Sequence, residues 1–302
     1  MHRAEFFFPS AMNEVKIFLT KILQTLLGID KYIGSSHNLL SANNALLTEI
    51  VYQQRLSSCK NNFARKYAKK YFSQTDEDGI TIEIIQRIKS ADINFSNTFA
   101  EFGVGNGLEN NTLVLLSLGW KGSWFGGQSL AFDPEESSRL NFHKTWITKE
   151  NILSLYQQST KDCRTDNIDV ISLDLDGNDH YFLHAILNSS VKPSLFIVEY
   201  NAIFPVGADW KINYDEGHRW NGDHYFGASL ESLTRLFCDF GYFLVACNPQ
   251  TGANAFFVRN EYRHLFADIP DNIEDIYVSP FYQLNNNFTH KISPEFIKSI
   301  TL

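Results

Sequence analysis

Between residues 98 and 258, short runs of apolar residues alternate with stretches of helical periodicity. Continuous apolar runs of this length predict buried strands, which we place at 98–102, 123–125, 169–173, 195–199, 242–247 and 254–258. Apolar residues spaced by three and four predict helices at 111–118, 179–187 and 230–240. Strands that alternate with helices favour a doubly wound α/β fold with a mostly parallel sheet. The last two strands are joined only by 248–253, so we expect the last strand to run antiparallel.

The N-terminal part of the chain has a different pattern. Apolar residues recur at intervals of three and four along Val15, Phe18, Leu19, Ile22, Leu23, Leu26 and Leu27. This spacing predicts an amphipathic helix, and a second helical stretch follows at 38–58. Lys16 and Lys21 make only a thin basic face, so we expect the helix to pack on its own domain rather than on a membrane surface or a partner.

The length of 302 residues suits one large domain with smaller attachments. We place an N-terminal helical appendage at 1–72, an α/β domain at 73–262, and a C-terminal extension that packs on the core at 263–302. The appendage is a lid, a dimer arm or a plain buttress, so a homodimer is among the expected arrangements.

Composition narrows the class of protein. The formal net charge of −8 argues against a nucleic-acid backbone as the main partner. No run of about 18 apolar residues occurs, so we expect no membrane span. The four cysteines form no CxxC pair, and the N-terminus lacks the residue order of a signal peptide. We therefore expect a reduced, cytoplasmic protein.

A glycine-rich turn is the strongest local signal for ligand binding. The segment 101–107 reads Glu-Phe-Gly-Val-Gly-Asn-Gly, and it follows a predicted strand and precedes a predicted helix. Gly103, Gly105 and Gly107 permit a tight turn and let ligand atoms approach the backbone closely. The polar residues 109–112 either cap the next helix or meet the ligand.

Acidic and amide side chains follow two predicted strands. Asp174, Asp176 and Asp179 come after the strand at 169–173. Glu199 is the last residue of the next strand, and Asn201 follows it. Parallel strands end at the same sheet edge, so we expect these oxygens to converge. Converging oxygens suit Mg²⁺, Ca²⁺ or Mn²⁺. Two alternatives stay open: proton abstraction or substrate positioning without a metal, and simple capping of the next helix.

The glycine turn, with an acid on the strand before it, resembles the first motif of class I methyltransferases. Three further segments follow the order of the FkbM-type members of that family: 73–79, 174–179 and 199–201. The resemblance covers roughly 70–260. It implies a seven-stranded, Rossmann-like sheet and S-adenosylmethionine as cofactor. It also implies methylation of a hydroxyl on a small molecule or glycan: a sugar, nucleotide sugar, polysaccharide precursor or secondary metabolite.

The resemblance also implies roles for individual residues. The residues that it assigns to S-adenosylmethionine are Gln74, Glu101, Gly103, Gly105, Asn106, Gly107, Asn110, Thr112, Gln128, Thr148, Asn151 and Asp174. In catechol-type relatives, residues matching Asp174, Asp176, Glu199 and Asn201 hold a divalent ion such as Mg²⁺ or Mn²⁺. The residues expected to position or deprotonate the acceptor are Asp176, Glu199 and His224.

The sequence departs from the family at the second strand, which usually ends in an acid that binds the ribose. Here that strand ends Trp-Phe-Gly-Gly-Gln at 124–128, so Gln128 or Asp133 would replace the acid. This departure keeps a second hypothesis open, a metal-dependent transferase or hydrolase of sugar phosphates. A third is a non-catalytic binding module with a methyltransferase fold. Binding of S-adenosylmethionine separates the first hypothesis from the second, and methyl transfer separates it from the third.

Overall fold

The computed structural model describes residues 9–91, 95–134 and 137–282. The chain divides into two compact units, Met1–Gln54 and Arg55–Leu302. Helix α1 (Pro9–Ser58) accounts for the described part of the first unit, and it joins the two predicted N-terminal helical stretches into one. None of the helices in the described ranges is long and apolar enough to cross a membrane.

The second unit is built on one seven-stranded sheet. Its strands are β1 (Thr98–Phe102), β2 (Lys121–Gly126), β3 (Leu140–Lys144), β4 (Val170–Leu173), β5 (Leu195–Glu199), β6 (Tyr242–Cys247) and β7 (Asn254–Arg259). The strand order is β3-β2-β1-β4-β5-β7-β6. Only β7 runs antiparallel to its neighbours β5 and β6, and the other pairings are parallel. The predicted mostly parallel sheet with its reversed last strand is confirmed.

The strand β3 is the one that the apolar pattern did not reveal. It lies at the sheet edge and pairs only with β2. Only Leu140 of its five residues is buried, because an edge strand with few covering side chains carries no continuous apolar run. In contrast, β1 and β4 are buried along their whole lengths, as expected for parallel strands covered on both faces.

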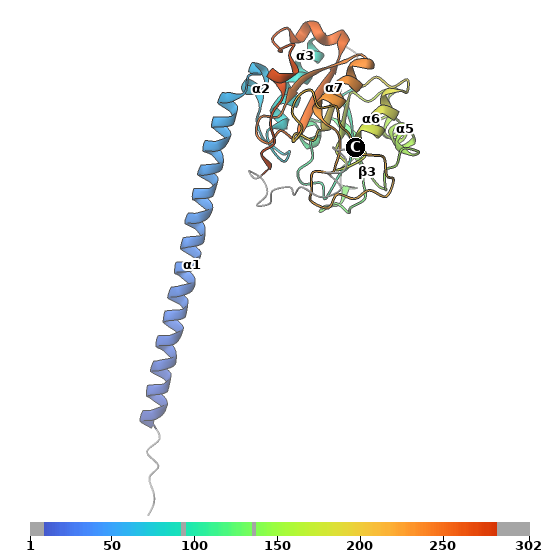
Figure 1. The fold of residues 1–302 in the computed structure, drawn as a ribbon. Helices are drawn as coiled ribbons and strands as arrows, with labels where there is room; N and C mark the ends of the chain where they lie inside the picture. Colours follow the sequence, from blue (N-terminus) through green and yellow to red (C-terminus); the bar gives the residue numbers. More distant parts are fainter. Residues whose placement is uncertain (1–8, 92–94, 135–136, 283–302) are drawn as a thin grey trace, which may run out of the picture. The chain divides into compact units, whose positions relative to one another are not determined.

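Helices cover both faces of the sheet (Figure 1). The helices are α2 (Asn62–Tyr67), α3 (Glu77–Ala91), α4 (Leu113–Ser117), α5 (Ile152–Cys163), α6 (Asp179–Leu187), α7 (Leu230–Asp239) and α8 (Ile273–Ile276), with a 3₁₀ helix η2 (Asn260–Phe266). One apolar cluster joins α5, α6 and α7 to the sheet, and another joins α2, α3, α4 and η2 to it. The result is the three-layered, doubly wound arrangement that the alternating pattern predicts.

The two ends of the parallel strands in such a sheet are not equivalent. Because β1, β2, β4 and β5 are parallel, their carboxyl ends lie at the same edge. The loops that leave this edge carry the glycine turn and the predicted acidic residues. Within the predicted C-terminal extension, Phe266 and Ile276 are buried, and 283–302 lie outside the described residues.

Candidate functional site

The glycine turn leaves β1 through a contact that only glycine can make. Gly103 has a φ of +100°, and a Cβ placed on it would lie 1.5 Å from the backbone oxygen of Asp174. The backbone N–H groups of Gly103 and Val104 both donate to the carbonyl of Phe125, at 2.9 and 3.1 Å. The turn is therefore fixed against the ends of both β2 and β4.

Gly105, by contrast, faces open space. A Cβ at Gly105 would meet no atom within 4 Å, and its φ is outside the left-handed region. Gly107 is again confined, since its φ is +84° and a Cβ would lie 3.0 Å from side-chain atoms of Leu130 and Phe132. Gly103 and Gly107 therefore shape the turn, whereas Gly105 leaves room beside it.

Glu101 uses its carboxylate to hold the helix that follows the turn. Its two oxygens accept the backbone N–H groups of Asn111 at 3.0 Å and Thr112 at 3.1 Å, and the Thr112 hydroxyl donates to it as well. Trp124 donates its indole N–H to that hydroxyl at 2.8 Å. Burial raises the pKa of Glu101, and the hydrogen bonds from Thr112 and Asn111 oppose the shift. Thr112, predicted to contact the cofactor, is engaged within this network.

A cavity of about 210 Å³ lies beside the turn. Its lining consists of Gln74, Glu101, Phe102, Gly103, Gly105, Asn106, Glu109, Asn110, Asn111, Asp174 and Asn254. These side chains are mostly acids and amides, and no Lys or Arg occurs among the lining residues that the structure describes. The cavity therefore favours a ligand with positive charge and hydrogen-bonding groups.

The structure brings together part of the predicted cofactor set at this cavity: Gln74, Glu101, Gly103, Gly105, Asn106, Asn110 and Asp174. Thr148 and Asn151 instead bond to each other at the start of α5, where the Asn151 side chain accepts the Thr148 N–H at 2.8 Å. Gln128 lies exposed just beyond β2. An acid at the end of β2 is absent, and Gly126 there lies so close to Val104 that a Cβ would come within 2.1 Å of its carbonyl.

A second, smaller cavity of about 90 Å³ opens next to the acidic loop. It is lined by Gly127, Thr145, Trp146, Ile147, Leu175, Gly177, Asn178, Phe182, Glu216 and His218. Sequence reasoning missed most of this lining. The nearest signal was the predicted pair Thr148 and Asn151, whose neighbours Trp146 and Ile147 form part of the wall.

The predicted acidic cluster assembles at the ends of β4 and β5. Asp174, Asp176 and Glu199 each offer a carboxylate oxygen, and these oxygens lie within 4.8 Å of one another. Asp176 has a φ of +52°, so the loop turns sharply at this residue and its side chain is solvent-exposed. Glu199 Oε2 is buried and has no hydrogen-bond partner in the part of the chain that the structure describes. Three hard oxygen donors with one unsatisfied atom fit a divalent cation such as Mg²⁺ or Mn²⁺.

The inner two acids interact strongly. Burial raises the pKa of both Asp174 and Glu199 well above the ordinary range. Repulsion from the charges of Asp176 and Asp179 adds to the shift of Asp174, and repulsion from Asp174 adds to that of Glu199. A hydrogen bond links the Asp174 and Glu199 side chains, so they hold a proton between them at pH values where an exposed carboxyl has lost it.

Two other residues of the predicted set keep the loops in place. The Asp179 carboxylate accepts the N–H groups of Leu175 at 2.7 Å and Gly177 at 2.8 Å, which closes the acidic loop onto α6. Burial raises the pKa of Asp179 to about 6. Asn201 donates its amide to the carbonyls of His224 at 2.8 Å and Phe226 at 3.0 Å. Asp179 therefore tightens the turn before α6 without capping the helix, and Asn201 orders the 224–226 loop.

Two histidines lie on the loops that border the site. His224 is buried, and burial lowers its pKa. His218 lines the smaller cavity and lies so close to the acidic loop that a Cβ on Gly177 would be 2.5 Å from its Cδ2. Nε2 of His218 is buried without a hydrogen-bond partner among the described residues. Although the Asp176 side chain reaches solvent, the protein packed around its carboxyl raises its pKa, and the charge of His218 opposes this shift. His218 is thus the histidine that the structure places beside the acids.

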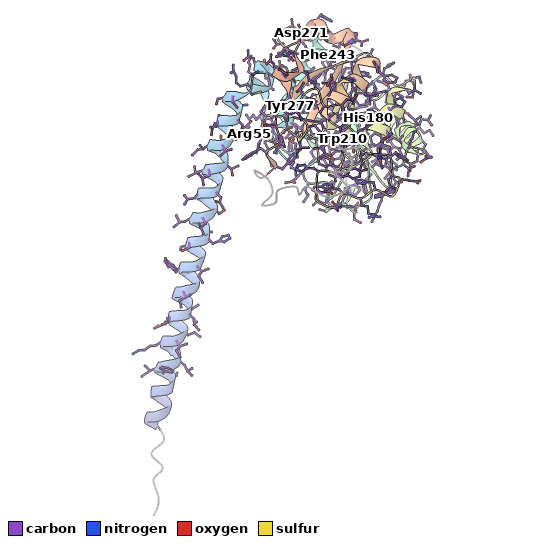
Figure 2. The ribbon with its side chains drawn as sticks, in the orientation of Figure 1. Arg55, His180, Trp210, Phe243, Asp271 and Tyr277 are labelled. Carbon is purple, nitrogen blue, oxygen red and sulfur yellow. The ribbon has the colours of Figure 1, made fainter. Side chains whose placement is uncertain are left out.

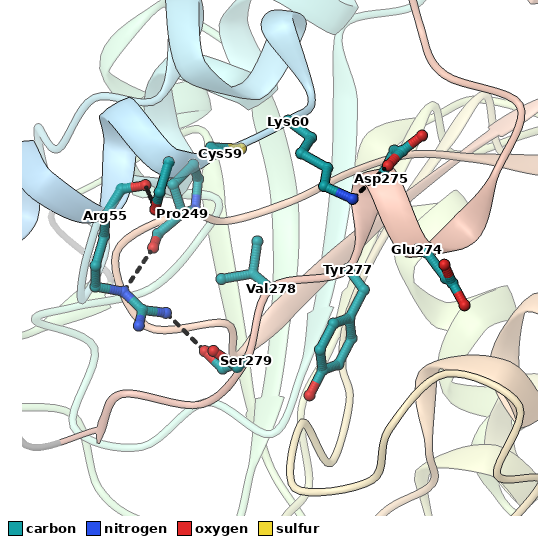
Figure 3. Close-up of a pocket in the computed structure, with 10 residues that line it drawn as sticks. Arg55, Cys59, Lys60, Pro249, Glu274, Asp275, Tyr277, Val278 and Ser279 are labelled. Atoms are coloured by element: carbon teal, nitrogen blue, oxygen red, sulfur yellow. Dashed lines mark hydrogen bonds and ion pairs between the residues drawn. The ribbon is translucent and has the colours of Figure 1, made fainter.

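A further cavity of about 220 Å³ has a different lining (Figure 3). Arg55 donates to the carbonyls of Pro249 at 3.2 Å and Ser279 at 2.6 Å, and Lys60 pairs with Asp275 at 3.0 Å. Its cationic groups are therefore engaged by the protein itself. These contacts tie the start of the second unit to its C-terminal segment, so we assign this cavity no ligand.

No family model and no curated protein matches the chain. Among solved structures, it resembles the MycE methyltransferase from the mycinamycin biosynthetic pathway in complex with Mg and SAH, with 14% identity over 71% of this chain and a TM-score of 0.39. The complex of MycE with Mg, SAH and mycinamycin VI is 14% identical over 71% of this chain, with a TM-score of 0.38. The pyocyanin biosynthetic protein PhzM is 12% identical over 60% of this chain, with a TM-score of 0.32. The chain spans 57%, 57% and 56% of these proteins, and likeness at this level carries no argument about the site.

We predict opposite outcomes for alanine at two glycines of the turn. Gly103→Ala should lower the free energy of unfolding by about 3 kcal/mol, because the Cβ meets the Asp174 backbone and the φ is left-handed. Gly105→Ala should change it by less than about 0.5 kcal/mol, since the position is open. Thermal unfolding of both variants checks this, and equal melting temperatures would contradict the geometry of the turn.

A second prediction concerns the acid pair in the presence of a chelator. A carboxyl with a raised pKa binds more protons in the folded state, so stability is lost as the pH rises through that pKa. The wild-type protein should therefore melt at a lower temperature at pH 8 than at pH 5.5. Glu199→Gln removes one of the two charges and should raise the melting temperature at pH 8 by about 2–4 °C, or roughly 1 kcal/mol.

The matched control is Glu109→Gln, an exposed acid of the larger cavity. It should leave the melting temperature unchanged at both pH values. A loss of stability in Glu199→Gln at pH 8 would show that the acid pair is not under electrostatic strain.

Proposed function

We propose that this chain is an S-adenosylmethionine-dependent O-methyltransferase. One observation carries the proposal: the cavity beside the glycine turn has acid and amide walls, no described Lys or Arg, and free space over Gly105. S-adenosylmethionine carries a sulfonium and an ammonium group, and both are favoured by carboxylates in a partly desolvated site. The resemblance of the turn and of the loops around it to FkbM-type enzymes supports the same cofactor.

The same wall offers a phosphate no cationic side chain, so the sugar-phosphate alternative would depend entirely on a divalent ion held by the acidic cluster. Phosphate groups are bound by Lys, Arg, helix N-termini or metal ions. Neither cavity at this sheet edge has Lys or Arg among its described lining residues, and the backbone N–H groups of Asn111 and Thr112 before α4 are taken by Glu101. We therefore place a neutral hydroxyl acceptor, such as a sugar, nucleoside-linked sugar, glycan or secondary metabolite, in the smaller cavity.

In this proposal, different residues of the chain orient the cofactor and exclude water. Bound S-adenosylmethionine supplies a methyl group activated by its sulfonium. The turn at Gly103–Gly107 and the side chains of Gln74 and Asn110 orient it, and Trp146 and Phe182 exclude water from the second cavity. The acceptor oxygen forms a bond to the methyl carbon as the carbon–sulfur bond breaks. S-adenosylhomocysteine is released, and the acceptor proton passes to a base of the protein.

The base and the metal ligands follow from the acidic cluster. Asp174, Asp176 and Glu199 would hold a divalent ion, whose chemistry would be to lower the pKa of the acceptor hydroxyl. His218, with its unsatisfied Nε2 beside Asp176, is the base that we favour for the acceptor proton. His224, which the sequence predicts in this role, stays a prediction.

Titration calorimetry with S-adenosylhomocysteine tests the cofactor assignment. We expect micromolar affinity for the wild-type protein and a loss of at least about 100-fold in Gly105→Val, whose Cβ would have no protein atom within 4 Å and whose side chain would occupy space beside the turn. The melting temperature of the variant without ligand serves as the control and should be unchanged. Undiminished binding in Gly105→Val, or none in the wild-type protein, would overturn the proposal.

Methyl transfer tests the acidic cluster and His218. With labelled S-adenosylmethionine and a panel of sugar and secondary-metabolite hydroxyls, His218→Ala should lower kcat by about 10²–10⁴ and leave S-adenosylhomocysteine affinity unchanged. Glu199→Gln should abolish stimulation by Mn²⁺ or Mg²⁺. The matched control is His264→Ala, an exposed histidine on η2. Full activity in His218→Ala would exclude that residue as the base, and cofactor binding without transfer to any hydroxyl would favour the binding module.

A further inference from the structure

Helix α1 carries an apolar seam that runs along most of its length. From Leu19 onward the seam positions are separated by three and four residues in strict alternation: Leu19, Ile22, Leu26, Ile29, Ile33, Ser36, Leu40, Asn43, Leu47 and Ile50. Its Leu and Ile side chains are 41–63% exposed, and Figure 2 shows the side chains standing out from the helix. An exposed stripe of this length, apolar except at Ser36 and Asn43, is not a normal free surface.

The period of the seam identifies the kind of surface that can cover it. An alternation of three and four is a repeat of 3.5 residues, whereas a straight helix has 3.6 residues per turn. The stripe therefore drifts by about 20° per heptad, or about 90° between Leu19 and Ile50. A flat membrane or a compact domain would lose contact with such a winding stripe. Another helix of the same period keeps contact by supercoiling.

The residue types along the seam set the number of helices. With Leu19 at position a of the heptad, position a is mostly Leu and position d is mostly Ile. Leu at a with Ile at d shifts parallel coiled coils from two strands to more, typically four. Position g adds further exposed apolar side chains, namely Phe18, Tyr32, Leu39 and Leu46. An apolar face that includes g is wider than a two-stranded seam requires.

Charge and helix propensity favour copies of the same chain as the partners. Residues 16–54 contain three lysines and two acids, so identical helices would not repel one another strongly. Membrane-surface helices instead carry a polar face rich in Lys and Arg. Asn43 interrupts the seam, and in a symmetric bundle it meets its own copies, which can satisfy its amide. Gly28 and Gly34, where a Cβ would meet nothing within 4 Å, weaken the isolated helix and make packing necessary.

We propose that α1 joins four copies of this chain in a parallel, left-handed coiled coil. The proposal is independent of the methyltransferase assignment, because it rests only on residues of the first unit. The seam is formed by positions a and d between Leu19 and Ile50, and the g side chains pack along its margin.

Light scattering or sedimentation of the full chain at micromolar concentration tests the proposal. We expect about four times the chain mass of 34.6 kDa. The double variant Leu19→Lys and Leu26→Lys places charges in the seam and should reduce the mass fourfold. Its matched control, Ile17→Lys and Leu27→Lys, changes two equally exposed apolar side chains of the same helix that lie outside a, d and g, and should remain four-stranded.

Asn43→Leu keeps the test decisive if the charged variants fold poorly. It should preserve the fourfold mass and raise the temperature at which helical signal is lost. A monomeric wild-type chain would overturn the proposal and favour packing of α1 on its own domain or, if the monomer sediments with lipid vesicles, on a membrane. A dimer would overturn the four-stranded arrangement, and equal behaviour of the two lysine pairs would overturn the seam.

Discussion

The arrangement of the site depends on one close approach, that of the Gly103 backbone to the Asp174 carbonyl. Asp174 also donates its N–H to Phe102 at 3.0 Å, so β1 and β4 remain paired to their last residues. Because no Cβ separates them, the glycine turn and the acidic loop leave the sheet side by side. The larger cavity has Gly103 and Asp174 in a common wall for this reason. A side chain at position 103 would move apart the two loops that define the site.

The fold was largely predictable because its strands are buried on both faces. Runs such as 195–198 and 242–247 are apolar throughout, and no exposed face interrupts the pattern. The apolar pattern does not predict the edge strand β3, because four of its five residues are not buried. The position of the turn and the convergence of Asp174, Asp176 and Glu199 were also predictable, since parallel strands bring their carboxyl ends to the same edge.

The roles of individual polar residues were less predictable because ligand contacts and helix starts use the same side chains. Thr148 and Asn151 hydrogen-bond to each other, and the Thr112 hydroxyl donates to Glu101. The Asp179 carboxylate accepts a backbone N–H of the loop before it. Nothing in the local sequence distinguishes these uses from cofactor contacts. His218 does not stand out in the sequence for a different reason. Its place beside Gly177 depends on how a long loop folds back over the acidic segment, which spacing along the chain does not encode.

If the chain transfers a methyl group as proposed, the electrostatics of the site would restrict the acceptor. Acidic walls attract a sulfonium, but the same negative potential opposes an acceptor that already carries a phosphate or carboxylate. A neutral hydroxyl avoids this repulsion, yet it must lose a proton in the reaction. Burial, and after it repulsion between the carboxylates, raises the pKa values of Asp174 and Glu199. A cation among them would relieve this repulsion and stabilise the alkoxide as it forms, so one ion would serve both the stability of the loops and the activation of the acceptor.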